Sequence, residues 1–526
     1  MRVSRSELAK LNLAEAVQNS LKYGIEHFPP LASDECLSDA ISLVAEQLRA
    51  RLERNYPLPV ETIGYPRKLF GIRPVAVSSL GTRALYKALA GKMIPYLPDP
   101  SRSDGAWPAH KEFGLKSKAS HVVEFDIASC YEYVDHNLLL EELVVRTGDA
   151  GTPQLMASFL TELQGRQLGL PQLWYESDIL ADTYLDILAR GLSRNMFAVS
   201  RFADDFRVLA SSFEEASAVI EQASELARRI GLVLSTEKTK IYTRKTLAAR
   251  HETDDDILSR YFADAEEAMA QAREFMMSGY DSDEDDDEEE IELDFAVYHM
   301  ILQDWFKAAD PVEGDPFLLE RLQGLIPRIL AVLRHAEEAV TPGQLAAIAS
   351  DNQARVEAVV KYIAARMELE RERVNHVSSN PFADVIDISA FSAPRVSENY
   401  WFTIKSIALN KRQNPWVKLW AIYAARIHAS EPFDGDELEV MKWLDEQIDD
   451  RHELVRAEAA WALVNEGRTS ASATKIVELY QRATDMTRPL LAAALSKVKS
   501  CPAGALKAVQ SDGPLMKEAV EWAKKN

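Results

Sequence analysis

The first half of the chain alternates two kinds of hydrophobic pattern. Short apolar runs, HVVEFDI from His121 and FRVLA from Phe206, have the length and composition of buried β-strands. Longer segments with apolar residues at helical spacing, ESDILADTYLDILARGL from Glu176 and FEEASAVIEQASELARRIG from Phe213, predict helices beside those strands. A helical start and the proline-punctuated stretch 56–74 precede them. This order predicts an α/β or α+β fold.

The second half is predicted to be helical. From about Thr253 the strand patterns almost vanish, and the segments WVKLWAIYAA, LVRAEAAWAL and TRPLLAAALS look alike. Counted from Lys418, Arg456 and Arg488, small or apolar residues recur three, six and seven places later in each segment. The three reference residues are 38 and 32 residues apart, a spacing that suits a two-helix repeat. This pattern resembles the second helix of HEAT-like repeats; an irregular helical bundle is the alternative.

Composition predicts a multidomain protein without a disulfide framework. The chain has 526 residues, of which 47% are apolar, and this length exceeds what one hydrophobic core usually serves. Its three cysteines are too few and too scattered for a set of disulfides or a CxxC zinc site. No stretch approaches the roughly 18 apolar residues that span a bilayer. We therefore expect a cytoplasmic protein with no membrane partner.

Almost all of the net negative charge lies in the second half of the chain. The net charge is −22, but residues 1–250 carry a balance of only −1, and residues 251–526 carry −21. The first half therefore stays compatible with nucleic acid, which normally requires Lys and Arg to meet its phosphates. Within the second half, the segment DSDEDDDEEEIELD at 281–294 has the like charge of a solvated loop, with a specific binding tail as the alternative.

Three carboxylates are the candidate catalytic residues. Asp126 ends one strand-like run, and RFADDFRVLAS places Asp204 and Asp205 at a polar tip between two apolar pieces, as in a β-hairpin. Phosphoryl transfer in polymerases needs carboxylates that bridge two Mg²⁺ ions about 4 Å apart, and rigid strand ends supply that precision. A lone ADD sequence is weak evidence, since a solvated turn is its commoner meaning.

Further motifs in a fixed order strengthen this interpretation. RKLFGIRPVAV begins at Arg67, GLPQLWYESDILADTYLDIL at Gly169, and GLVLSTEKTKIY at Gly231. Together with the carboxylate segments they resemble the ordered motifs of reverse transcriptases: fingers R-P, palm D-x-x-x-x-aromatic, G-x-P-Q followed by S-x-x-L-A, the x-A-D-D hairpin, and L-x-x-x-K-T. The similarity covers roughly residues 60–245.

The resemblance implies a metal site. Asp126 and Asp204 are expected to ligate or bridge two Mg²⁺ ions, with Asp205 as a nearer or secondary ligand. The carbonyl oxygen of Ile127 is a further expected ligand, and Mn²⁺ is expected to substitute for Mg²⁺.

The resemblance also implies a nucleotide site. Arg73, helped by Lys68 or Arg67, is expected to contact the triphosphate, because guanidinium pairs with phosphate oxygens through two donors. Tyr131 lies five residues after Asp126 and matches the aromatic steric gate that favours dNTPs over rNTPs. The alternatives are surface charge for the two basic helpers and a core aromatic for Tyr131.

Two more positions of the nucleotide site follow from the later motifs. Gln172 is expected beneath the incoming nucleotide or the opposite base, and Lys238 near the leaving pyrophosphate and among the catalytic residues. An ordinary exposed lysine is the alternative for Lys238.

The sequence departs from the family in two places. Many relatives have Gly after the Gln of the third motif, whereas this chain has the bulky residues Leu173, Trp174 and Tyr175. They are either simple packing or a reshaped template channel. No thumb of the usual kind is recognisable after Tyr242, so the normal grip on a long duplex is in doubt.

The predicted organisation is N-terminal helices and fingers at 1–110, a reverse transcriptase palm at 111–248, and an α-helical repeat domain at 249–526. A palm followed by HEAT-like helices resembles the bacterial abortive-infection and defence-associated reverse transcriptases. That resemblance implies a phage-defence polymerase making single-stranded DNA from dNTPs, usually as a homo-oligomer. Some members use no conventional template or prime from a protein hydroxyl. A non-coding RNA and a protein partner both stay open.

Two other functions remain open at this stage. One is a retron- or mobile-element-type enzyme that copies a cognate RNA, although such enzymes usually carry basic binding surfaces that are not apparent here. The other is an inactive palm that serves as a scaffold for the repeats. Retention of Asp126, Asp204, Asp205, Tyr131 and Lys238 argues against the scaffold.

Overall fold

The computed structural model describes residue 3 and residues 5–67, 71–103, 105–250, 261, 295–378, 400–428, 435–465, 473–498, 501 and 503–526. The chain divides into two compact units. The first unit comprises residues 1–12, 51–58 and 85–297, and the second comprises 13–50, 59–84 and 298–526. Each unit therefore combines segments that are far apart in the sequence. The predicted boundaries near residues 110 and 248 stay predictions.

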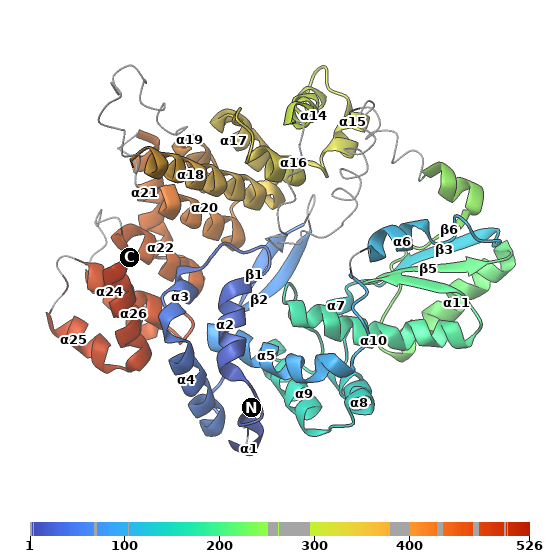
Figure 1. The fold of residues 1–526 in the computed structure, drawn as a ribbon, viewed down its shortest axis with the longest axis horizontal. Coiled ribbons are helices and arrows are strands. Elements are labelled where there is room, and N and C mark those ends of the chain that lie inside the picture. Colours follow the sequence, from blue (N-terminus) through green and yellow to red (C-terminus); the bar gives the residue numbers. More distant parts are fainter. Residues whose placement is uncertain are drawn as a thin grey trace. The chain divides into compact units, whose positions relative to one another are not determined.

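The first unit is built on a four-stranded antiparallel sheet, in the order β4-β5-β3-β6 (Figure 1). Its strands are β3 (His121–Asp126), β4 (Val199–Phe202), β5 (Asp205–Ala210) and β6 (Lys240–Thr243). Its helices are α1 (Arg5–Leu8), α6 (Ala106–Glu112), α7 (Cys130–Tyr133), α8 (His136–Thr147), α9 (Gly151–Gln164), α10 (Tyr175–Arg194) and α11 (Phe213–Arg229), with the 3-10 turn η2 (Ile94–Tyr96). The two strands and two helices predicted from the hydrophobic pattern are confirmed as β3, β5, α10 and α11.

The two faces of this sheet differ because side chains alternate along each strand. Phe125 and Phe206 are cross-strand partners on one face and stack with ring centroids 4.9 Å apart. The helix α11 packs against β3 and β5, and α10 packs against α11 and β4. The neighbouring positions along β3 and β5, which include the carboxylate Asp126, therefore point to the opposite face.

The short helix α6 packs beside this opposite, polar face. The buried guanidinium of Arg207 on β5 donates to the carbonyl oxygen of His110 at 3.0 Å, and Arg207 also pairs with Glu124 on β3. The ring of His110 lies 2.9 Å from the hydroxyl of Ser200 on β4. Burial and the positive charges of Arg207 and Lys111 lower the pKa of His110 to about 4. A neutral histidine thus anchors α6 on the sheet.

The second unit contains the two-stranded antiparallel hairpin of β1 (Val60–Pro66) and β2 (Ile72–Ser78). Its helices are α2 (Leu13–Tyr23), α3 (Ala32–Glu35), α15 (Pro316–Leu322), α16 (Ile326–Leu333), α17 (Pro342–Asp351), α18 (Val356–Ser378), α19 (Trp401–Ala408), α20 (Pro415–His428), α21 (Gly435–Gln447), α22 (Glu453–Asn465), α23 (Ala473–Arg482), α24 (Arg488–Lys497), α25 (Ala503–Ser511) and α26 (Pro514–Lys525), with the 3-10 turns η1 (Ser38–Ala40) and η3 (Gln353–Arg355). Three helices cross a boundary between the units along the chain: α4 (Ile41–Arg54), α5 (Leu80–Met93) and α14 (Phe295–Ala308).

Carboxylates join distant segments of the second unit by capping helices. Glu61 on β1 accepts the backbone N–H groups of Glu453 and Leu454 at 2.9 and 3.1 Å, at the start of α22. Glu458, on α22 itself, accepts those of Ala32 and Ser33 at 3.0 Å, at the start of α3. Such caps satisfy N–H groups that the first helical turn leaves without a partner. The predicted fingers hairpin is thereby fastened to the C-terminal helices.

His27 forms a second junction in this unit. Its ring stacks on Tyr65 of β1 with centroids 5.2 Å apart, and its carbonyl oxygen accepts the indole N–H of Trp416 at 2.6 Å. Burial lowers the pKa of His27, but hydrogen bonds to Glu26 and Glu357 and their charges outweigh burial and raise it to about 10. A charged imidazolium therefore bridges the N-terminal segment, the hairpin and the helices.

The C-terminal helices pack in successive pairs. The three segments that look alike in the sequence fall on α20, α22 and α24, and α22 packs against both of the others. Ala421, Ala459 and Ala494 on these helices are fully buried, as close stacking requires. Lys418 on α20 binds Asp450, just before α22, at 2.6 Å. The helical character is confirmed; the HEAT-like assignment stays a prediction.

Two further expectations concern this half of the chain. The acidic segment 281–294 lies outside the described residues. In the part of the chain that the structure describes, no helix combines the length and the apolarity that a bilayer crossing requires.

Candidate active site

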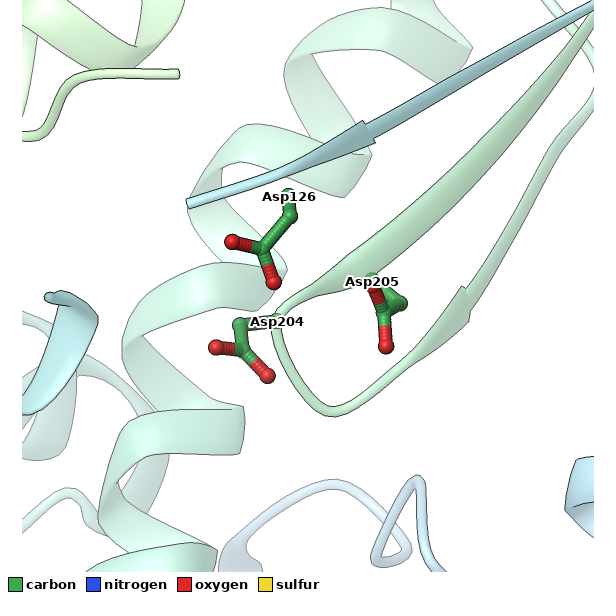
Figure 2. A group of neighbouring side chains, drawn as sticks. All are labelled: Asp126, Asp204 and Asp205. Atoms are coloured by element: carbon green, nitrogen blue, oxygen red, sulfur yellow. The ribbon is translucent and has the colours of Figure 1, made fainter. Parts of the chain in front are cut away.

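Three carboxylates meet where the central strands of the sheet end. β3 ends at Asp126, the turn from β4 to β5 carries Asp204, and β5 begins at Asp205. Asp126 lies opposite Asp205 in the antiparallel register, and Ile127 donates its backbone N–H to the carbonyl oxygen of Asp204 at 3.3 Å. Carboxylate oxygens of the three residues lie within 4.8 Å of one another (Figure 2). The structure thus brings together the three residues singled out in the sequence.

The turn that carries Asp204 is held by a buried network. Ala203 has a φ of 52°, in the left-handed region that residues with a side chain rarely adopt. Its N–H donates to the hydroxyl of Ser101 at 2.9 Å, and its carbonyl oxygen accepts from Arg201 at 3.0 Å. Both partners bind Asp182 of α10, which is 4% exposed. The strained turn is therefore fixed on both sides by groups from three different segments.

The cluster concentrates negative charge. Burial and the charges of Asp204 and Asp126 raise the pKa of Asp205 to about 6. The Nζ atom of Lys238 lies 2.9 Å from Asp126 Oδ1. Burial lowers the pKa of this lysine, but the hydrogen bond to Asp126 and the nearby carboxylates outweigh burial and raise it. Hard oxygen donors packed this closely suit a divalent cation such as Mg²⁺, which would neutralise the repulsion between them.

The predicted gate and glutamine lie in the same unit as the cluster. Tyr131 follows the end of β3 on α7, and its hydroxyl donates to Asp178 on α10. Gln172 donates to Glu132 at 2.7 Å, next to Tyr131 in the chain. The backbone also joins the two segments, since Leu170 donates its N–H to the carbonyl oxygen of Tyr131 at 2.7 Å.

Arg73, the main residue predicted to contact the triphosphate, lies in the second unit and not in the unit of the carboxylates. Arg73 lies on β2 in the second unit, opposite Tyr65 in the hairpin register. The Nε atom of Arg73 is buried and makes no hydrogen bond within the described residues. Of the two predicted helpers of Arg73, Lys68 lies outside the described residues, and Arg67 donates its backbone N–H to the carbonyl oxygen of Gly71 at 2.8 Å.

A basic hollow lies beside Asp205. Its walls carry five cationic side chains and two carboxylates: Lys111, Arg207, Lys238, Lys240 and Arg250, with Glu124 and Asp205. Trp107 of α6 and Tyr242 of β6 add aromatic surface. This local excess of positive charge, in a chain whose net charge is −22, is what a phosphodiester strand requires.

Residues 67–280 match the family model of reverse transcriptase (RNA-dependent DNA polymerase). They form a reverse transcriptase domain. The activity of this family is RNA-directed DNA polymerisation, so the predicted enzyme class is confirmed. Reverse transcriptases use divalent metal ions, and the aspartate cluster of this domain supplies suitable donors. No curated protein matches the chain.

Sequence reasoning missed the residues that support the site. Asp182, Arg201 and Ser101 hold the turn that carries Asp204, and Arg102 and Asp178 contact the hydroxyl of Tyr131 or each other. Four of the five are charged, and charged residues in a single sequence are most simply interpreted as solvated surface. Asp178 and Asp182 do lie within the segment SDILAD, which carries the S-x-x-L-A motif. Their position in this motif is the one sequence feature that could have indicated a role at the site.

Proposed function

We propose that this chain makes single-stranded DNA from dNTPs by two-metal nucleotidyl transfer and acts in bacterial antiphage defence. The carboxylate cluster at the hairpin turn of a reverse transcriptase domain is the observation that carries the chemical part. The defence role is supported by the resemblance of a palm followed by repeated helices to defence-associated reverse transcriptases. Synthesis proceeds with or without a template, and the primer is either a nucleic acid or a protein hydroxyl.

In the proposed mechanism, Asp126 and Asp204 would hold two Mg²⁺ ions, and Asp205 and the carbonyl oxygen of Ile127 would be additional ligands. When bound, these ions supply charge neutralisation and activation of the attacking 3′-hydroxyl. In this proposal Lys238, whose Nζ atom lies 2.9 Å from Asp126 Oδ1, balances the charge of the carboxylates and meets the leaving pyrophosphate.

Other residues bind and select the nucleotide in this proposal. Arg73 and Lys68 bind the triphosphate, Gln172 supports the base, and the ring of Tyr131 crowds a 2′-hydroxyl.

Incorporation of labelled nucleotide by the purified chain tests the proposed chemistry. We expect incorporation of dNTPs with Mg²⁺ and none after chelation with EDTA. Sequencing of the nucleic acid that co-purifies, before and after incubation with dNTPs, shows whether a cognate RNA is bound and what DNA is made. A long DNA copy of one bound RNA would favour the retron-type alternative. No incorporation with any template or primer would favour the scaffold.

We further propose that the acidic C-terminal half holds subunits together and does not bind duplex. Its balance of −21 opposes the binding of phosphate groups, and the positive charge of Lys405 is neutralised by Asp436 and Glu439 at 3.0 and 2.7 Å. For the full chain we expect sedimentation as an oligomer and weaker binding to a 20-mer duplex than to a single strand of the same length. A monomer that binds the duplex tightly at physiological salt contradicts this proposal.

A further inference from the structure

The backbone of Tyr131 is fixed by the G-x-P-Q segment. Leu170 donates to the carbonyl oxygen of Tyr131 at 2.7 Å, and Gly169 has a φ of 95°. A Cβ atom at Gly169 would lie 3.3 Å from the carbonyl oxygens of both Tyr131 and Glu132. Only glycine combines this conformation with so close an approach. The start of the Tyr131 side chain is therefore set by the segment that also carries Gln172.

The far end of the ring is fixed by an ion pair. The hydroxyl of Tyr131 donates to Asp178 Oδ1, and Arg102 Nη1 lies 2.5 Å from Asp178 Oδ2. Arg102 also donates to the hydroxyl of Tyr131 at 3.4 Å, which closes a triangle of three side chains. Asp178 lies in the first turn of α10, where the helix dipole stabilises a carboxylate. Burial and the charge of Asp178 raise the pKa of Tyr131, so the hydroxyl keeps its proton for this bond.

We propose that Asp178, supported by Arg102, is the positioning residue that holds the Tyr131 ring and so sets how strictly the domain excludes ribonucleotides. This inference rests on the proposed role of Tyr131 as the gate. A steric gate excludes ribonucleotides only while its ring stays in place, because a small displacement of the ring makes room for the 2′-hydroxyl group. A ring anchored at its backbone alone retains rotamer freedom, whereas a charge-assisted hydrogen bond at the hydroxyl removes it.

Removal of the Tyr131 hydroxyl distinguishes a gate that depends on Asp178 from a gate that depends on the ring alone. Tyr131→Phe keeps the ring and its volume but cannot bind Asp178. We expect Tyr131→Phe and Asp178→Ala each to lower the ratio of dNTP to rNTP kcat/KM by about tenfold, which is the typical equilibrium effect of one hydrogen bond to a charged group. A general loss of structure would lower both values together, whereas a loosened ring raises the rNTP value.

Asp186 provides the matched control. It lies two turns further along α10, is 24% exposed like Asp178, and pairs with Arg146 at 2.5 Å. Asp186→Ala should leave the ratio at its wild-type value. If Tyr131→Phe and Asp178→Ala retain wild-type discrimination while Tyr131→Ala loses it, the ring acts alone and the inference is overturned. If Tyr131→Ala also retains it, the gate assignment fails as well, and absence of dNTP incorporation by the wild type overturns the proposed function itself.

Discussion

Replacement of Asp126 or Asp204 by asparagine is expected to reduce nucleotide incorporation by at least about a thousandfold. Each substitution keeps the side-chain volume but removes one negative charge from the cluster that would hold the metal ions. Loss of metal-based stabilisation is worth several kcal/mol in the transition state, and about 4 kcal/mol corresponds to about a thousandfold in rate. Primer extension with labelled dNTPs measures the effect.

The Asp204→Asn variant should not be less stable than the wild type. The three carboxylates repel one another, as the raised pKa of Asp205 shows, so neutralising Asp204 relieves that repulsion in the metal-free protein. Thermal unfolding in EDTA tests this. Glu225→Gln is the matched control. Glu225 lies on α11, 74% of its side chain is exposed, and it pairs with Arg229 one helical turn later. Wild-type incorporation by either Asp126→Asn or Asp204→Asn would contradict the site.

Local patterns were sufficient to predict the elements that carry the three clustered aspartates. An apolar run that ends in Asp126 and a polar tip at Asp204 specify a strand end and a hairpin turn, because side-chain alternation and turn chemistry are properties of short segments. The ordered motifs then identified these pieces as parts of one palm. The structure brings the carboxylates together as this interpretation requires.

Contacts between distant segments could not be predicted in this way. Glu61 caps a helix that begins 392 residues later, and Arg426 pairs with Glu35 at 2.5 Å across a similar separation. A single sequence contains no signal for such pairs, since each partner looks like an ordinary exposed charge. For the same reason, the sequence did not indicate that the hairpin bearing Arg73 belongs to the same compact unit as the C-terminal helices.

Asp182 supports the turn that carries Asp204 from a buried position. Its Oδ1 accepts from Arg201 at 2.5 Å and from the hydroxyl of Ser101 at 2.7 Å, and its Oδ2 accepts the N–H of Ser101 at 2.7 Å. Asp182→Ala removes all three bonds and leaves the charge of Arg201, whose side chain is 10% exposed, without its carboxylate. Loss of one member of a buried ion pair typically costs about 3–5 kcal/mol, so we expect a lower unfolding temperature.

Activity should fall for a separate reason. Arg201 and Ser101 hold the two sides of Ala203, which has a φ of 52° and directly precedes Asp204. Without this support the turn would let the carboxylate of Asp204 shift. A misplacement of about 1 Å at a reacting centre costs about a hundredfold in rate. The double variant Asp182→Leu with Arg201→Met separates the two effects, because an apolar pair of similar volume often restores the stability of a buried ion pair. We expect it to regain the unfolding temperature but not the incorporation rate. Recovery of both would mean that the network only stabilises the fold and does not position Asp204.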